Sequence, residues 1–268
     1  MKQLLVDCVR SAGAILLNYL GAVGEVSLKE NQSSVVTQAD LAAEKCIFEK
    51  IRAKFPDHGL IGEESGYQRR SSDLVWVVDP LDGTSNFVAG LPWFGVMVAV
   101  LEAGSPILAG MYLPCAGTLY LAEAGGGVER DGKPVRMTSE TDLRKVLCTY
   151  AIDASADQAT SRWQVEMITR LVGSVRNVRS TNCLLDLCYA LEGRFGGCVL
   201  HSAKIWDIAP SVLMFPEAGG RFTELDGRDV QFRLDVEPHD RNYAVLGASQ
   251  ALHPQLLRVI SATDSCAL

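Results

Sequence analysis

Apolar residues recur at helical spacing over residues 4–19 of the chain. Steps of three and four residues place them on one face, as in an amphipathic helix that packs against a core. The polar stretch 29–34 follows and predicts a loop. A second helix is expected from about Thr37 to Lys54, because Pro56 and Gly59 then interrupt the pattern. The apolar face of the first helix comprises Leu4, Leu5, Cys8, Val9, Ala12, Ile15, Leu16 and Tyr19.

Short apolar runs between turn residues predict strands from residue 74 onward. Hairpins dominate up to about residue 135, with turns at 103–106 and at Asp131-Gly132. Strands and helices alternate after that, and Pro216 should kink or shorten the helix that contains it. The expected strands are 74–78, 95–101, 107–113, 118–123, 146–150, 175–179, 197–200 and 243–248, and the expected helices are 163–171, 183–191, 206–218 and one from about 254.

The composition narrows the class of protein. The chain has 268 residues, 48% of them hydrophobic, enough for one large domain or two tightly joined halves. A net charge of -7 without runs of like charge disfavours nucleic acid and acidic membranes as partners. The N-terminus lacks a signal-peptide core and no apolar stretch reaches the length of a membrane span, so we expect a cytoplasmic protein.

Cysteines are scattered without a CxxC pair, which favours free thiols in a reducing compartment over a disulfide framework. Most of them stand in apolar runs, where a thiol behaves as a small hydrophobic group. They are Cys8, Cys46, Cys115, Cys148, Cys183, Cys188, Cys198 and Cys266.

The strongest local signal is the segment Asp79-Pro80-Leu81-Asp82-Gly83-Thr84, at the carboxyl end of an apolar strand. Active sites of open sheets favour that position. Carboxylate oxygens suit hard cations such as Mg²⁺, which keep water ligands that become nucleophiles. Gly83 lets backbone amides approach an anion such as phosphate. An Asp-Gly turn after an edge strand is the alternative.

Two carboxylates are few for a site with more than one metal ion, so further carboxylates must come from other parts of the chain. Glu63 stands beside Glu64 in a glycine-bounded loop, which alone would be an ordinary solvated loop. Asp207 begins a helix, where an acid also complements the helix dipole. Asp40 fits a capping box that starts at Thr37.

Together these motifs resemble the inositol monophosphatase family of lithium-sensitive, magnesium-dependent phosphatases. The family pattern is Asp-Pro-(Ile/Leu)-Asp-Gly-Thr, then Trp-Asp, then eleven residues and Gly-Gly. Here it reads Asp79 to Thr84, then Trp206-Asp207, with 208–218 before Gly219-Gly220. The resemblance implies an α+β or α/β fold, a layered α/β/α/β/α sandwich, in a single domain over 1–265 with approximate halves 1–140 and 141–265. It also implies a homodimer.

The resemblance further implies roles for individual residues. Two or three Mg²⁺ ions would be held by Asp79, Glu63, the Leu81 carbonyl, Asp82 and Asp207. Thr84, positioned by Asp40, would orient the attacking water, and the amides of Gly83 and Thr84 would bind the phosphate. Lys29 would lie near the metals, on the family's mobile loop. The substrate is then a small phosphorylated metabolite, and no phosphoenzyme is needed.

Two departures concern the pocket for the alcohol half of the substrate. Family members carry Gly-Ser/Thr-Ala where this chain has Thr181-Asn182-Cys183, and a hydroxyl-binding glutamate where it has Leu200, followed by His201. Since leucine accepts no hydrogen bond, we expect weaker selectivity for inositol 1-phosphate. The other candidate substrates are fructose 1,6-bisphosphate, histidinol phosphate and 3'-phosphoadenosine 5'-phosphate.

Two rival functions remain at this point. Haloacid dehalogenase phosphatases use a covalent Asp-x-Asp-Gly-Thr motif, but here the acids are three apart and Pro80 stands in the nucleophile's place. Some bacterial members of the inositol monophosphatase family are partners of the transcription machinery, and a fold does not fix a function.

Overall fold

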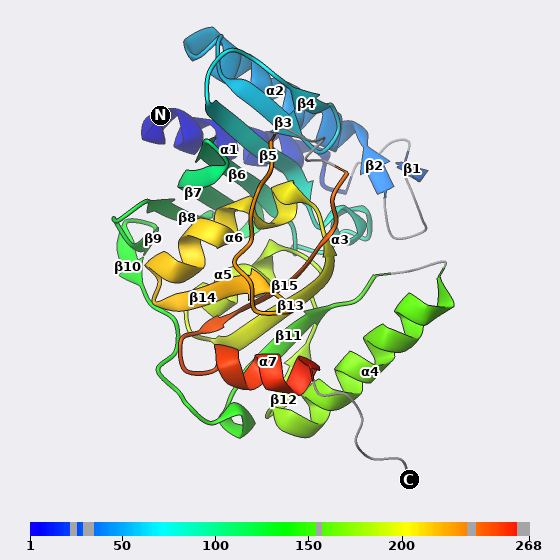
Figure 1. Ribbon diagram of the computed structural model, residues 1–268. Helices are drawn as coiled ribbons and strands as arrows, with labels where there is room; N and C mark the ends of the chain where they lie inside the picture. The colour runs from blue at the N-terminus through cyan, green and yellow to red at the C-terminus, as the bar shows by residue number, and fades with distance from the viewer. Residues whose placement is uncertain (22–25, 29–34, 154–156, 235–239, 262–268) are drawn as a thin grey trace.

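Two main sheets, a separate pair of strands and three layers of helices make up the computed structural model, which describes residues 1–21, 26–28, 35–153, 157–234 and 240–261 (Figure 1). The helices are α1 (Lys2–Tyr19), α2 (Gln38–Lys54), α3 (Thr84–Val88), α4 (Gln158–Ser174), α5 (Leu184–Leu191), α6 (Ile205–Glu217) and α7 (His253–Ser261). The strands are β1 (Val26–Leu28), β2 (Val35–Thr37), β3 (Gly59–Gly62), β4 (Gly66–Gln68), β5 (Leu74–Asp82), β6 (Gly95–Glu102), β7 (Ser105–Leu113), β8 (Thr118–Glu123), β9 (Val128–Arg130), β10 (Lys133–Val135), β11 (Leu147–Ala151), β12 (Asn177–Arg179), β13 (Phe195–Ala203), β14 (Gly220–Glu224) and β15 (Tyr243–Ser249).

The two main sheets are built from different parts of the chain. An eight-stranded sheet runs β10-β9-β8-β7-β6-β5-β3-β4, and a five-stranded sheet runs β12-β11-β13-β15-β14. β1 and β2 form a separate pair. β11 is parallel to both β12 and β13, and the crossover connections that parallel strands need are provided by α4 and α5. β6, β7 and β8 are antiparallel neighbours joined by short connections.

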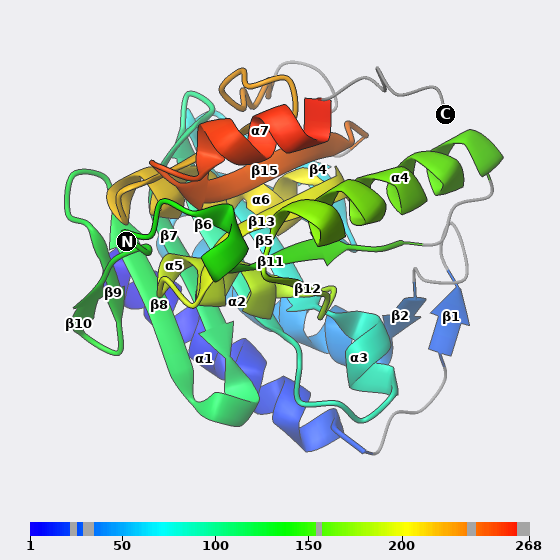
Figure 2. The ribbon, with the colours of Figure 1, turned by 90° about the horizontal axis from the view of Figure 1, so that it is seen from below.

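Helices and sheets alternate in layers (Figures 1 and 2), and three hydrophobic cores lie between these layers. α1 and α2 pack on one face of the eight-stranded sheet, around residues such as Trp76. α5 and α6 lie between the two sheets, around Met97 and Phe215. α4 and α7 cover the outer face of the five-stranded sheet, around Tyr150 and Leu256. This is the α/β/α/β/α sandwich expected from the resemblance.

Most elements fall where the pattern of apolar residues predicts them. α1 buries Leu5, Cys8 and Leu16 along one face. α2 begins at a capping box, since Ala39 N donates to Thr37 Oγ1 at 3.1 Å and Thr37 N to Asp40 Oδ2 at 2.8 Å. The stretch 29–34, predicted as a loop, lies outside the described residues.

Several predicted boundaries need correction, and the strand expected at 197–200, for example, spans Phe195–Ala203. The strand expected at 74–78 continues to Asp82, because its pairing with β6 resumes at Asp82 and Gly95 after an irregularity. The helix expected at 163–171 begins at Gln158, where Asp157 caps it. α6 ends at Glu217, directly after Pro216, and Ala218 N still donates to Met214 O at 2.9 Å. A proline in the last turn therefore ends this helix without interrupting it earlier.

All seven cysteines within the described residues are free thiols, and Cys266 lies beyond them. Burial raises the pKa of the Cys8 and Cys148 thiols to about 12, so neither is a reactive thiolate near neutral pH. Among the described helices, none is long and apolar enough to cross a membrane.

Candidate active site

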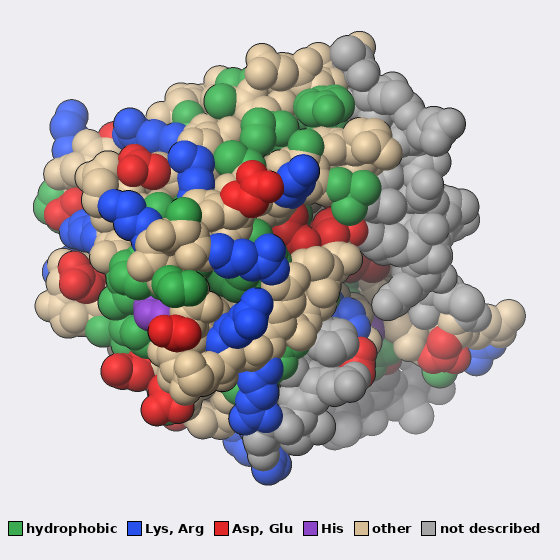
Figure 3. Space-filling view, turned by 90° about the horizontal axis from the view of Figure 1, so that it is seen from above, with side chains coloured by type: hydrophobic (Ala, Val, Ile, Leu, Met, Phe, Trp, Pro, Cys, Tyr) green, Lys and Arg blue, Asp and Glu red, His purple; other side chains and the backbone are tan. Residues whose placement is uncertain are grey.

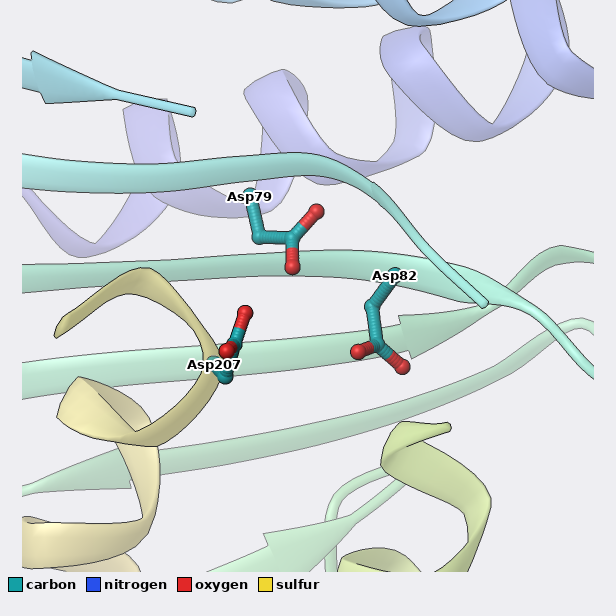
Figure 4. A group of neighbouring side chains, drawn as sticks. All are labelled: Asp79, Asp82 and Asp207. Atoms are coloured by element: carbon teal, nitrogen blue, oxygen red, sulfur yellow. The ribbon is translucent and has the colours of Figure 1, made fainter. Parts of the chain in front are cut away.

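Three aspartates from two distant segments meet at one edge of the eight-stranded sheet (Figure 4). Asp79 and Asp82 stand at the carboxyl end of β5, and Asp207 stands in the first turn of α6. One carboxylate oxygen from each lies within 4.8 Å of the others. Asp79 is buried, whereas the other two side chains are partly exposed, so the group is open on one side.

The end of β5 is shaped by the residues between the aspartates. Asp79 Oδ1 accepts a hydrogen bond from Leu81 N at 3.0 Å, which fixes the turn of the chain. Gly83 then adopts φ +88°, and a Cβ there would lie 2.7 Å from the Trp93 carbonyl oxygen. Only glycine fits both the backbone angle and the space. α3 begins directly afterwards at Thr84, so the predicted turn leads into a short helix.

The sequence left two interpretations of Asp207 open, a carboxylate of the acidic site and an acid at the start of a helix, and the structure supports both. Its Oδ2 accepts a hydrogen bond from Lys204 N at 2.6 Å and so caps α6. The same side chain supplies an oxygen to the three-aspartate group. A capping role and a position in the acidic site therefore coexist in one residue.

The electrostatics of the group favour a bound cation. Burial, followed by the charges of Glu63, Asp82 and Asp207, raises the pKa of Asp79 well above its usual value. Burial raises the pKa of Asp82 to about 7, and burial with the charges of Glu63 and Asp82 raises that of Asp207. Gathering these carboxylates is costly in the absence of an opposite charge. An all-oxygen donor set of this kind fits Mg²⁺.

Glu63 lies close to the three aspartates but outside the group within 4.8 Å. It occupies the turn between β3 and β4, and its backbone N donates to Val78 O at 3.3 Å on the neighbouring strand β5. The adjacent Glu64 N donates to Glu44 Oε2 of α2 at 2.9 Å. The predicted loop is therefore anchored on both sides and not an ordinary solvated one.

Asp40 and Thr84 are also brought together, as the resemblance implied. Thr84 Oγ1 lies 3.2 Å from Asp40 Oδ1 and 2.9 Å from the Leu81 carbonyl oxygen. Asp40 is fully buried and also accepts a hydrogen bond from the Thr37 hydroxyl, at 2.6 Å. The capping interpretation of Asp40 is thus correct, and its second oxygen reaches the site.

The residues predicted for the substrate pocket are more dispersed. Cys183 is buried next to Thr181, with 3.3 Å between Sγ and Oγ1. His201 lies at the end of β13, its ring centroid 4.5 Å from that of Trp163 of α4. Leu200 precedes it and is partly buried. Lys29 lies outside the described residues. The pocket roles of these residues stay predictions.

Sequence reasoning missed Asp153, and it named Asn182 only as part of the segment 181–183 that departs from the family pattern. Asn182 Nδ2 donates to Asp153 Oδ1 at 3.2 Å, and the Asp153 charge raises the pKa of both Asp82 and Asp207. No motif marks Asp153. Seen from above, acidic side chains lie in a recess of the surface with Lys and Arg side chains around it (Figure 3).

The sequence profile of the inositol monophosphatase family matches residues 1–264. The chain is 31% identical to a fructose-1,6-bisphosphatase/inositol-1-monophosphatase of Aquifex aeolicus, over 93% of this chain and 90% of that one. It is 30% identical to the Nus factor SuhB of Escherichia coli K12, over 98% and 94%. Among solved structures, a Thermotoga maritima IMPase superposes with a TM-score of 0.83 at 26% identity, covering 97% of both chains.

Proposed function

Because the chain belongs to the inositol monophosphatase family and is thus a phosphoric monoester hydrolase, we propose that it hydrolyses small phosphate monoesters, inositol 1-phosphate foremost. The observation that carries this proposal is the convergence of Asp79, Asp82 and Asp207 within 4.8 Å. A partly exposed group of carboxylates with raised pKa values is expected of a catalytic metal site.

The family is metal-dependent, and we propose Mg²⁺ as the cation, with two or three ions. Asp79, Asp82, Asp207, Glu63 and the Leu81 carbonyl would hold them. When bound, Mg²⁺ supplies a Lewis acid for the phosphate and lowers the pKa of water. The Leu81 carbonyl already accepts the Thr84 hydroxyl at 2.9 Å, and its second lone pair remains for a cation.

Thr84 and Asp40 would orient the attacking water. The Thr84 hydroxyl carries one proton and faces two acceptors, so its lone pairs are left to receive a hydrogen bond from water. Buried Asp40 fixes the rotamer of Thr84 from the first turn of α2. We propose that the amides of Gly83 and Thr84, at the start of α3, bind the phosphate. Direct attack by water leaves no phosphate on the protein.

A relative supports the choice of substrate. The name of the Aquifex aeolicus protein includes both inositol-1-monophosphatase and fructose-1,6-bisphosphatase. Fructose 1,6-bisphosphate is therefore the second substrate we propose, ahead of histidinol phosphate and 3'-phosphoadenosine 5'-phosphate.

A turnover panel of those four esters tests the proposal directly. Phosphate release is measured with Mg²⁺, with the metal chelated, and with an Asp79→Asn variant. We expect Mg²⁺-dependent release from inositol 1-phosphate that the variant abolishes. Absence of turnover on all four esters would contradict the proposal.

A second function has one observation in its favour, the 30% identity to the Nus factor SuhB of Escherichia coli over 98% of this chain. We propose a regulatory partnership with the transcription machinery as that alternative, compatible with hydrolysis. Copurification with RNA polymerase by an Asp79→Asn variant that has lost turnover would separate this role from catalysis. We also propose a homodimer, which sedimentation would test.

A further inference from the structure

The carboxyl ends of β11 and β13 lie side by side near the acidic site. The strands are parallel, and their register pairs Ala151 with Leu200. Leu200 is the position at which the sequence lacks a hydrogen-bond acceptor for the substrate alcohol. Asp153 stands two residues beyond Ala151, at the same end of the sheet, where ligands of parallel strands gather. A carboxylate is thus present on the neighbouring strand.

The backbone of Asp153 is held firmly without help from its carboxylate. Asp153 N donates to Gln164 Oε1 at 3.2 Å, and Gln164 Nε2 donates to Asp153 O at 3.0 Å. Gln164 belongs to α4 and is buried. These two bonds fix the end of β11 to α4, so the structural tie between the elements does not need the Asp153 side chain.

Asn182 orients the Asp153 side chain. Its Nδ2 donates to Asp153 Oδ1 at 3.2 Å, and its Oδ1 accepts Ile152 N at 2.9 Å. Asn182 adopts φ +52°, a conformation that asparagine tolerates better than most residues. Within the described residues, the amide of Asn182 donates to Oδ1 of the Asp153 carboxylate, and Oδ2 carries lone pairs that can accept a further hydrogen bond.

A short chain of contacts links this carboxylate to the three-aspartate group. Leu184, two residues after Asn182, donates its backbone N–H to Asp82 Oδ2. The charge of Asp153 also acts on Asp82 and Asp207. Burial raises the pKa of Asp153, and His201 and the hydrogen bond from Asn182 act against that rise, while burial holds the pKa of His201 below its usual value.

We propose that Asp153 determines specificity, accepting a hydrogen bond on Oδ2 from a hydroxyl of the alcohol half of the substrate. This inference rests on the proposed phosphatase function and assigns its substrates to esters of hydroxyl-bearing alcohols such as polyols and sugars. Asn182 is then a positioning residue, which acts through Asp153. The acceptor missing at Leu200 is supplied from the neighbouring strand.

The test compares esters with and without hydroxyl groups. Asp153→Asn is assayed with Mg²⁺ on inositol 1-phosphate, glycerol 2-phosphate and 4-nitrophenyl phosphate. A hydrogen bond to a charged group contributes about 1.5–3 kcal/mol, so kcat/KM for the first two should fall roughly ten- to hundredfold. Turnover of 4-nitrophenyl phosphate should change by less than about threefold, because its alcohol has no hydroxyl to bind.

Two further variants separate position from charge. Asp153→Glu keeps the charge near the metal site but displaces the acceptor, so selectivity should fall while the Mg²⁺ concentration for half-maximal activity stays unchanged. Asp157→Asn, the same substitution at the exposed cap of α4, should behave as the parent.

An equal fall on all three esters would place Asp153 in the metal site or the fold and overturn the inference. Unchanged selectivity would also overturn it. Failure of the parent protein to hydrolyse even 4-nitrophenyl phosphate would instead contradict the proposed function, and the inference would fall with it.

Discussion

Asp40 and Thr84 are 44 residues apart in the sequence, yet Oδ1 of the aspartate lies 3.2 Å from Oγ1 of the threonine. The other oxygen of Asp40 accepts both N–H and O–H of Thr37, at 2.8 and 2.6 Å. One carboxylate therefore caps α2 and reaches a hydroxyl at the start of α3. The capping bonds leave it little freedom to rotate, which fixes the position of the Thr84 hydroxyl.

Thr84→Ala should lower kcat by about 100-fold, because the attacking water would no longer be held in the correct orientation. Thr84→Ser, which keeps the hydroxyl, should retain most of the activity. Steady-state kinetics at saturating Mg²⁺, with the Mg²⁺ dependence measured in parallel, would check both. A Thr84→Ala enzyme within a few-fold of the parent would contradict the role assigned to the hydroxyl.

Asp207→Asn should lower the affinity for Mg²⁺ and the turnover by at least about 100-fold. Loss of a group that merely orients a metal ligand already costs about 10–100-fold, and Asp207 is proposed as a ligand itself. Asparagine retains an oxygen for the Lys204 amide, so the stability of α6 should change little.

Asp207→Ala removes the cap as well and should cost about a further 1 kcal/mol of unfolding free energy. Calorimetric Mg²⁺ titration and urea unfolding of the two variants separate the metal role from the cap. Normal Mg²⁺ binding by Asp207→Asn would show that the three aspartates do not form one metal site.

The sequence predicts those parts of the site that a local motif encodes. Asp79 and Asp82 both stand at the end of one strand, and the burial of Asp79 follows from the apolar run before it. Asp207 was predictable only through the resemblance, because its approach to β5 depends on α6 packing between the two sheets.

Asp153 escaped prediction for a related reason. It ends an ordinary strand, and its position near the site is set by the pairing of β11 with β13 and by a hydrogen bond from Asn182. Contacts between residues that are far apart in the sequence produce no periodic or regularly spaced pattern of residues. The sequence analysis also missed β14, which is short and begins at the second of two glycines. Its neighbouring residues Phe222 and Thr223 are both buried, so apolar and polar positions do not alternate clearly along it.

We expect the folded protein to lose stability in acid because of His253. It is fully buried, and its Nε2 lies 2.9 Å from Thr223 Oγ1, whose proton goes to Glu224 O at 2.8 Å. Burial lowers its pKa from 6.5 to about 4. Between these two values the unfolded chain binds more protons than the folded one, so stability falls as the pH falls.

The full effect of His253 amounts to about 3 kcal/mol, since each pKa unit corresponds to about 1.4 kcal/mol. His253→Gln should be less stable at pH 7 but should lose less stability between pH 6.5 and 4 than the parent. Urea unfolding across that range measures the two slopes. Parallel slopes would mean that His253 does not titrate in this window.

Direct attack by water predicts that no phosphate becomes attached to the protein. Rapid quench with ³²P-labelled inositol 1-phosphate, followed by peptide mapping, should recover no label on Asp79 or Asp82. Both side chains are proposed as metal ligands, and Pro80 stands between them where a covalent motif would need a nucleophile. Labelled aspartate at either position would replace the water mechanism with a covalent one.

The last prediction concerns Leu200, which is partly buried at the end of β13 beside His201. Leu200→Glu would add a second carboxylate across from Asp153. Each hydrogen bond to a charged acceptor contributes about 1.5–3 kcal/mol, so kcat/KM for inositol 1-phosphate should rise by about one to two powers of ten. For fructose 1,6-bisphosphate it should fall, because the added charge repels the second phosphate. The double variant Leu200→Glu with Asp153→Asn should recover part of the selectivity lost by Asp153→Asn alone. If Leu200→Glu leaves the ratio of the two kcat/KM values unchanged, the strand ends of β11 and β13 do not contact the alcohol half of the substrate.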